Sequence, residues 1–246
     1  MNIRTLHELF YFAGFLLKSA PARRKLRKLA ETDPKESFRL SHSQITGAVN
    51  RMFDISGSTL TVKGLENIPE ETCLFASNHL SYFDIVVLEK CLPEEKKAGF
   101  IAKDSLKKIP GLSGWMELIR CIFLNRTDAK AGLKSILLGA DYLKEGYNMF
   151  IFPEGTRCKE GQLGEFKAAS LKMAQKARVP VVPVAITGTS SILENNPGFT
   201  MKPSRVTITF GEPIRIHELP RPEQKGAVED VRRTIQDAIN EELAKN

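Results

Sequence analysis

The sequence lacks an apolar run long enough to cross a membrane. Its longest strongly apolar stretch, residues 9–17 (LFYFAGFLL), would extend only ~14 Å as a helix, against ~30 Å of hydrocarbon in a bilayer. A secretory signal is a second interpretation, because residues 19–22 (SAPA) loosely resemble a cleavage site. Against it, Glu8 stands where such a signal carries positive charge. The run cannot span a bilayer by itself.

The sequence is also poor in the residues of metal and disulfide motifs. Its four cysteines and four histidines are scattered along the chain, with no C-x-x-C spacing. We therefore expect no metal site and no disulfide framework of the kind found in small secreted domains. Reduced thiols in a cytosolic setting fit this pattern best.

Motifs of two function classes are missing. No G-x-S-x-G elbow of a serine hydrolase occurs, and the nearest match, GLSGW at residues 111–115, has the wrong spacing. Ser77 and Ser81 flank a histidine, so a covalent serine route stays open but is disfavoured. The base-reading and stacking motifs of nucleic-acid binders are absent as well, so no nucleic-acid partner is expected.

Positive charge is concentrated near the start of the chain. Residues 1–30 carry seven lysines and arginines against Glu8 alone, which places +6 of the net charge of +7 in this segment. An aromatic-rich helix followed, after Pro21, by the basic segment 22–30 (ARRKLRKLA) is typical of an interfacial membrane anchor. We predict that residues 1–54 form a helical arm on an anionic phospholipid surface, peripheral or monotopic, at the cytoplasmic face of the cell membrane. The alternative is a helical arm packed on its own domain or on a second subunit.

Beyond this arm the chain alternates between short apolar runs and segments of helical period. Seven runs rich in Val, Ile and Phe predict strands at residues 59–64, 73–78, 99–103, 121–125, 148–153, 179–186 and 205–211. Two of them, 148–152 and 179–186, are almost continuously apolar, as expected of parallel strands covered on both faces. No internal repeat or Gly/Ser-rich linker divides the region. We predict one α/β domain at residues 55–246, with a mostly parallel central sheet covered by helices.

Two helices are predicted around this sheet. Apolar residues at spacings of three and four between Asp128 and Gly146 predict a crossover helix between two parallel strands. A second apolar stripe, from Val228 to Leu243, predicts a terminal helix that packs against the sheet.

His79 and Asp84 follow a predicted strand in the segment ASNHLSYFD. In an unbroken helix their side chains would lie ~140° apart, and in a strand they would point to opposite faces, so contact requires a turn. At the carboxyl edge of a parallel sheet, a neutral imidazole can accept the proton of an alcohol while the carboxylate fixes its tautomer. The alternative is a helix-capping histidine and an aspartate near a helix start, each satisfied locally.

Two further groups of charged residues stand at predicted strand ends. Glu154 and Arg157 follow the strand 148–153 in FPEGTR, where a guanidinium can hold a phosphate and Glu154 can hold a hydroxyl or order the arginine. The alternative is a structural Glu–Arg pair. Lys103 and Arg126 end two other strands and predict an anion between them. Between these two cations, PGLSGW at residues 110–115 predicts a compact loop beside the site rather than a plain helical crossover.

Taken in order, these segments resemble the four motif blocks of the glycerolipid acyltransferases, and within that family the bacterial 1-acyl-glycerol-3-phosphate acyltransferases. The matching residues are His79 and Asp84 in NHLSYFD, Lys103 with Pro110 and Gly114, Phe123 and Arg126 in FLNR, Glu154 to Arg157 in FPEGTR, and Pro183 in VPVVPVAITG. The resemblance covers about residues 55–215. Four ordered blocks are specific where each short motif alone is weak. The N-terminal arm lies outside it.

The resemblance implies direct transfer of a fatty acyl group from acyl-CoA or acyl-carrier protein to the 2-hydroxyl of lysophosphatidate, giving phosphatidate. It implies that His79, oriented by Asp84, takes the hydroxyl proton, that Arg157 with Lys103 and Arg126 grips the phosphate, and that Glu154 positions the glycerol. The substrate-binding residues that it implies are Lys103, Arg126, Glu154, Gly155, Thr156 and Arg157. No cofactor is expected, because the thioester is already activated.

Other functions stay open at this point. A member of the same family could act on another lysophospholipid or on glycerol-3-phosphate. A non-catalytic protein that binds anionic membranes would explain residues 1–30, but it would leave the charged groups at the strand ends as coincidence.

Overall fold

The structure is a computed structural model that describes residues 2–124 and 129–245. Within these residues the chain forms a seven-stranded sheet with the order β1-β7-β6-β2-β5-β3-β4. The strands are β1 (Thr59–Lys63), β2 (Leu74–Ser77), β3 (Ala98–Lys103), β4 (Ile122–Leu124), β5 (Asn148–Ile151), β6 (Val181–Thr187) and β7 (Arg205–Phe210). All neighbouring pairs are parallel except β6 and β7. The predicted mostly parallel α/β sheet is confirmed.

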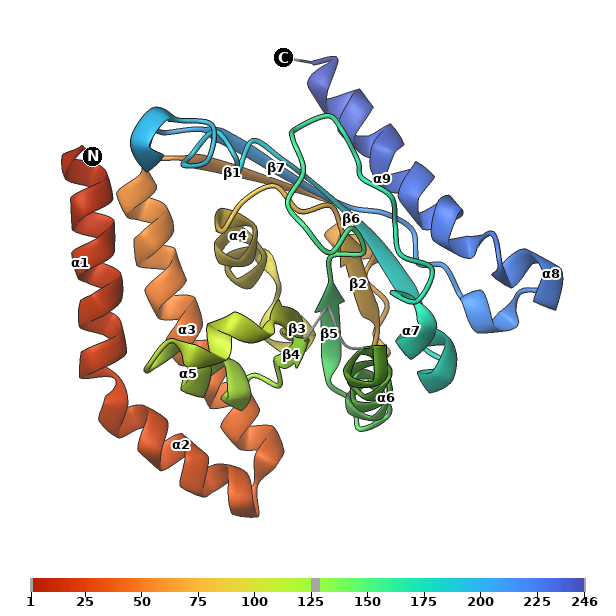
Figure 1. Cartoon of the computed structure of the whole chain (residues 1–246), viewed down its shortest axis with the longest axis horizontal. Coiled ribbons are helices and arrows are strands. Elements are labelled where there is room, and N and C mark those ends of the chain that lie inside the picture. Colours follow the sequence, from red (N-terminus) through yellow and green to blue (C-terminus); the bar gives the residue numbers. More distant parts are fainter. Residues whose placement is uncertain (1, 125–128, 246) are drawn as a thin grey trace.

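Helices cover both faces of the sheet (Figure 1). They are α1 (Ile3–Lys18), α2 (Ala20–Thr32), α3 (Pro34–Ser56), α4 (Phe83–Cys91), α5 (Leu112–Leu118), α6 (Ala129–Lys144), α7 (Lys172–Ala177), α8 (Arg221–Gln224) and α9 (Ala227–Leu243). One apolar core joins the sheet to α3 and α4, and a second joins its other face to α6, α7 and α9.

Alternate residues of the central strands enter these two cores. In β2, Phe75 belongs to the core on the α4 side, whereas Leu74 and Ala76 belong to the core on the α6 side. All seven residues of β6 are buried. Burial on both faces explains why these strands are apolar throughout instead of alternating with polar residues.

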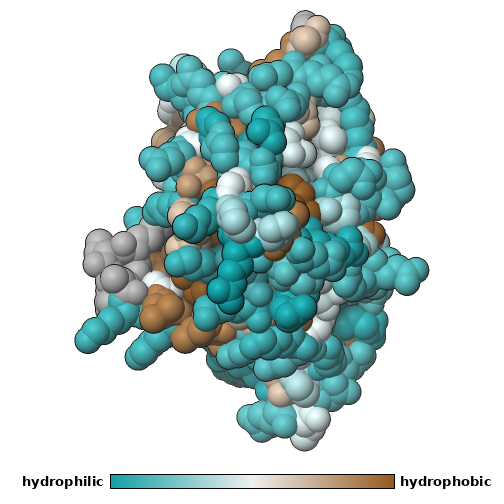
Figure 2. Space-filling model, turned by 90° about the vertical axis from the view of Figure 1, so that its right-hand side faces the viewer, coloured by the Kyte–Doolittle hydropathy of each residue, from teal (hydrophilic) through white to brown (hydrophobic). Residues whose placement is uncertain are grey.

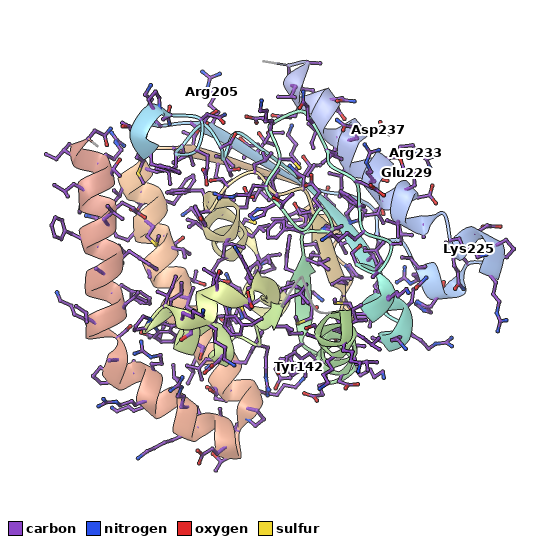
Figure 3. The ribbon with its side chains drawn as sticks, viewed as in Figure 1. Tyr142, Arg205, Lys225, Glu229, Arg233 and Asp237 are labelled. Atoms are coloured by element: carbon purple, nitrogen blue, oxygen red, sulfur yellow. The ribbon has the colours of Figure 1, made fainter. Side chains whose placement is uncertain are left out.

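The two predicted helices are present. Helix α6 connects β4 to β5, and these strands run in the same direction with β3 between them. The predicted start of this helix at Asp128 lies outside the described residues. Helix α9 buries Val231, Ile235 and Ile239 against the sheet. Its charged residues Glu229, Arg233 and Asp237 lie on the side that faces away from the sheet (Figure 3).

Part of the apolar stripe of α6 remains on the surface. Ala140 and Leu143 are buried in the core, whereas Leu133, Leu137 and Leu138 are exposed. The side of the molecule that carries α7, α8 and α9 is mostly hydrophilic, with smaller areas where apolar side chains gather (Figure 2). Ile136, Ala140 and Leu143 therefore form the side of α6 that packs against the sheet.

The N-terminal helices pack on the α/β body. Helix α3 runs through the predicted domain boundary between residues 54 and 55, and Phe53 and Ile55 enter the main core. Arg4 of α1 donates hydrogen bonds to the carbonyl oxygens of Ile55 and Ser56 at the end of α3. The boundary thus falls inside a helix whose two ends belong to one packed structure.

The segment between β3 and β4 is not the compact loop beside the site that its sequence predicted. It forms a 3-10 turn at Asp104–Lys108 and the short helix α5. Trp115 of α5 is buried, stacks on Phe15 and donates a 3.0 Å hydrogen bond to Ser19 Oγ. Gly114 allows this docking, because a Cβ there would lie 2.8 Å from Cδ of Arg23. Packing against α1 and α2 draws the segment into a helix.

Candidate active site

His79 and Asp84 meet at the carboxyl end of β2. The strand ends at Ser77, α4 begins at Phe83, and the residues between them form a turn. This turn brings His79 Nδ1 to 2.7 Å from Asp84 Oδ2. The contact that required a turn in the sequence is present in the structure.

Four donors surround the carboxylate of Asp84, which is completely buried. Besides His79, the backbone N–H groups of Leu80 and Ser81 donate to Oδ2 at 2.7 and 2.9 Å. The hydroxyl of Thr189 donates to Oδ1 at 2.5 Å. Because the carboxylate only accepts, its bond to His79 places the proton on Nδ1 and leaves Nε2 as the nitrogen that can take a proton.

The segment after β5 holds the backbone of His79. Its N–H donates to Glu154 Oε1 at 2.9 Å, and its carbonyl oxygen accepts from the N–H of Cys158 at 2.8 Å. The imidazole stacks on the ring of Phe152, with centroids 4.1 Å apart. The side chain of His79 remains 20% exposed. The ring is fixed on one face and remains accessible to a substrate.

Neighbouring strands are tied together just before the histidine. The side chain of Asn78 donates to the carbonyl oxygen of Ile186 in β6 and accepts from its N–H, both at 2.8 Å. This pair of bonds extends the β2–β6 ladder by a side chain. These two bonds therefore fix where, along β6, the chain leaves β2 and enters the turn that carries His79.

Glu154, which the resemblance expects to position the glycerol, lies buried against the backbone of the site. The residue is 5% exposed, and its second oxygen accepts from the N–H of Gly164 at 2.7 Å while the first accepts from His79. Both oxygens thus hold backbone groups of the site. Gly155 has a φ of +71°, and a Cβ there would lie 2.8 Å from Nζ of Lys167. The left-handed backbone conformation favours glycine at this turn.

Arg157 reaches back toward α4. Its guanidinium carbon lies 4.2 Å from the centre of the Tyr82 ring, and Nη1 donates to Glu194 Oε1 at 2.9 Å. Thr156 is exposed beside it. Lys103 ends β3 with an exposed side chain, and β5 lies between β3 and β2 in the sheet. Arg126 lies outside the described residues.

The cysteine in this segment is not an activated nucleophile. Burial, followed by the neighbouring carboxylate of Glu154, raises the pKa of the Cys158 thiol to about 11. A thiol with that pKa is protonated at neutral pH. The thiol is therefore not a candidate nucleophile, and the imidazole of His79 remains the candidate reactive group.

Sequence reasoning missed four residues that shape the site: Tyr82, Phe152, Thr189 and Glu194. Thr189 and Glu194 follow β6, whose predicted strand lies beside β2. Their position after a parallel strand is a signal that could have found them, because carboxyl ends of parallel strands share one edge. Nothing in the sequence indicates which partners they contact.

Known proteins resemble this chain over the same region. The profile of the family described as Acyltransferase matches residues 59–187. A chloroplast protein of Brassica napus named 1-acyl-sn-glycerol-3-phosphate acyltransferase BAT2 is 33% identical over 155 residues, which is 62% of this chain and 44% of that protein. A probable 1-acyl-sn-glycerol-3-phosphate acyltransferase of Mycoplasma pneumoniae is 29% identical over 187 residues, covering 75% of this chain and 69% of its own. The chain spans less than half the length of the plant relative.

A solved structure resembles almost the whole chain. The 1-acyl-sn-glycerophosphate (LPA) acyltransferase PlsC from Thermotoga maritima superimposes with a TM-score of 0.74 and 26% identity, covering 98% of both chains. The similarity therefore includes the N-terminal helices, which the sequence motifs did not reach. Because the family profile covers more than half of the chain and includes His79, Asp84 and Arg157, the chain belongs to the acyltransferase family.

Proposed function

We propose that the chain transfers a fatty acyl group from a thioester to the 2-hydroxyl of 1-acyl-glycerol-3-phosphate, giving phosphatidic acid in phospholipid biosynthesis. The observation that carries the proposal is the fixed His79–Asp84 pair, with Nε2 left to accept a proton. The names of the relatives support the same acceptor.

The geometry is suited to a direct displacement. Nε2 of His79 takes the hydroxyl proton as the acceptor oxygen attacks the thioester carbonyl. Collapse of the tetrahedral intermediate breaks the carbon–sulfur bond, and the imidazolium returns the proton to the leaving thiolate. Asp84, held by four donors, stabilises the imidazolium without moving. The thioester supplies the activation, so no cofactor takes part in the proposal.

The acceptor phosphate belongs near Arg157 in this proposal. The guanidinium packs on Tyr82, three residues after His79, and has donors besides the one bound to Glu194. Lys103 and Arg126 would assist from the ends of neighbouring strands. We place Gly155 and Thr156 beside the acceptor, with Glu154 acting on it through the backbone that it holds. The acyl donor is acyl-CoA or acyl-carrier protein.

The N-terminal helices are the proposed contact with an anionic membrane at the cytoplasmic face. Among the described residues, no helix combines the length and apolarity that crossing a bilayer needs. Helix α1 exposes Ile3, Leu9, Phe10 and Leu17. In α2, Arg27 pairs with Glu117 of α5, whereas the exposed residues Arg24, Lys25 and Lys28 make no ion pair with any described residue. Apolar and basic side chains thus lie on adjacent helices, as in interfacial anchors.

Acceptor-dependent release of thiol from acyl-CoA tests the activity. We expect release with lysophosphatidate, less release with glycerol-3-phosphate or another lysophospholipid, and loss in His79→Ala. His217→Ala, in the 3-10 turn Ile216–Glu218, is the matched control and should stay active. Undiminished activity in a folded His79→Ala protein would refute the assignment. Intact mass after incubation with acyl thioester alone should show no adduct on Ser77 or Ser81.

A further inference from the structure

Glu194 joins the phosphate-binding arginine to the turn that carries the catalytic pair. It lies in the segment between β6 and β7, outside the matched region 59–187. Its Oε1 accepts from Arg157 Nη1 and from the N–H of Tyr82, both at 2.9 Å, and its Oε2 accepts from Ser81 Oγ at 2.6 Å. The side chain is 15% exposed. Two of its three bonds go to the turn before α4, so the carboxylate is anchored independently of Arg157.

This carboxylate restrains a side chain that would otherwise be mobile. The side chain of Arg157 is 36% exposed and has many rotamers available. Glu194 holds it by Nη1, and the ring of Tyr82 supports its face, with Nη2 3.5 Å from the Tyr82 hydroxyl. A guanidinium carries five N–H donors in a rigid fork, so donors remain for a phosphate. The arginine is oriented before the acceptor arrives.

The same anchor connects Arg157 with the base. Ser81, which donates its hydroxyl to Glu194, donates its N–H to Asp84 Oδ2, and that oxygen accepts from His79. Phosphate-binding and proton-accepting groups are therefore parts of one hydrogen-bonded network. A change at Glu194 alters where the phosphate is held relative to Nε2 of His79.

We propose that Glu194 is a positioning residue that fixes Arg157 for the acceptor phosphate. The inference rests on the proposed function. Two physical effects of Glu194 on phosphate affinity oppose each other. Its negative charge repels a phosphate, so removal would strengthen acceptor binding on charge alone, whereas loss of the anchor weakens it. The sign of the change in acceptor KM therefore tells which effect dominates.

Steady-state kinetics on the full chain, with acyl-CoA and lysophosphatidate in mixed micelles, provide the test. For Glu194→Ala we expect the KM for lysophosphatidate to rise about tenfold and the KM for acyl-CoA to stay unchanged. Glu194→Gln keeps an oxygen for Arg157 and Tyr82, and its amide can donate to Ser81 Oγ. Its acceptor KM should stay within about threefold of the wild type. Glu165→Ala, an exposed glutamate of the segment between β5 and α7 that carries Arg157, is the matched control.

A double-mutant cycle separates positioning from general structural support. In an Arg157→Ala background, Glu194→Ala should have no further effect on the acceptor KM. Three results would overturn the proposal. The acceptor KM could fall in both Glu194 variants, or Glu194→Ala could still change the acceptor KM in the Arg157→Ala background. The KM values for lysophosphatidate and acyl-CoA could also rise equally. If the wild type is active and Glu194→Ala has the same acceptor KM, this inference alone is refuted. A wild type without acceptor-dependent thiol release would refute the proposed function and this inference with it.

Discussion

Asp84 is the side chain on which the geometry of the site depends. Its two oxygens accept from His79, from two backbone N–H groups and from Thr189. The backbone bonds come from the turn before α4, where the helix N-terminus also favours a negative charge. Thr189 is completely buried and follows β6 in the sequence. The orientation of His79 thus depends on the hydroxyl of Thr189, which is 105 positions from Asp84 in the sequence.

Thr189→Val should lower kcat about tenfold with little change in the KM for lysophosphatidate, because one buried oxygen of Asp84 loses its donor at a cost of ~1–3 kcal/mol. The remaining three donors keep the pair in place. Steady-state kinetics measure the effect, and Thr189→Ser, which keeps the hydroxyl, should restore most of kcat. Equal losses in the two variants would contradict a role through the hydroxyl.

At the scale of elements, the N-terminal end of α1 makes polar contacts with the body, and the helix also buries a carboxyl group there. Asn2 and Thr5 exchange hydrogen bonds with the backbone of Met201. Glu8, one turn further, is 7% exposed, and among the described residues its carboxyl oxygens have no hydrogen-bond partner. Burial raises the pKa of Glu8 to about 7. We therefore expect the contact between α1 and the body to depend on pH.

The sign of this effect follows from the raised pKa. Below the ordinary pKa of a glutamate, Glu8 is protonated in both the folded and the unfolded chain, so burying its neutral carboxyl lowers the stability of the fold only a little. Between the ordinary value of 4.5 and the folded pKa of about 7, the unfolded chain loses this proton while the folded chain keeps it, so stability falls by on the order of 3 kcal/mol and changes little above that range. Glu8→Gln should therefore stabilise the protein more at pH 8 than at pH 5. Urea unfolding at both pH values measures this, with the exposed Glu31→Gln as control. A gain independent of pH would contradict ionisation as the cause.

On the scale of the whole molecule, the basic arm and the α8–α9 end lie on opposite sides (Figure 1). Exposed apolar residues of α1 adjoin the basic helix α2, whereas Lys225, at the end of α8, lies far from them (Figure 3). The arm also packs on its own body through α3 and α5, as the alternative interpretation expected. Packing against the body and the proposed contact with a membrane are compatible, because they would use different faces of the helices.

The paired change Arg24→Glu and Lys28→Glu should weaken binding to anionic vesicles strongly, since each basic residue near the surface contributes ~1 kcal/mol. Arg221→Glu with Lys225→Glu, an equal charge change on α8, should leave it nearly unaltered. Vesicle sedimentation measures the binding, which should also fall with salt. Tight binding to random duplex DNA without vesicle binding would contradict the membrane role of the arm.

Local pattern was sufficient for much of the architecture. The seven strands, the crossover at α6 and the terminal helix α9 were predicted from the sequence, because apolar periodicity reports which faces are buried. The motif blocks also placed His79 and Asp84 beyond one strand and Glu154 and Arg157 beyond another. These predictions needed only neighbours in the sequence and the rule that parallel strands share an edge.

Long-range packing decided the rest. Residues 112–115 belong to the helix α5, which packs on α1 and α2, and the boundary at residue 54 falls inside α3. Glu154 became a backbone acceptor, and Thr189 and Glu194 joined the site from the segment after β6. A sequence shows that a side chain can donate or accept. Only the folded chain shows which partner lies within hydrogen-bond distance, because those partners are brought together by contacts between distant segments.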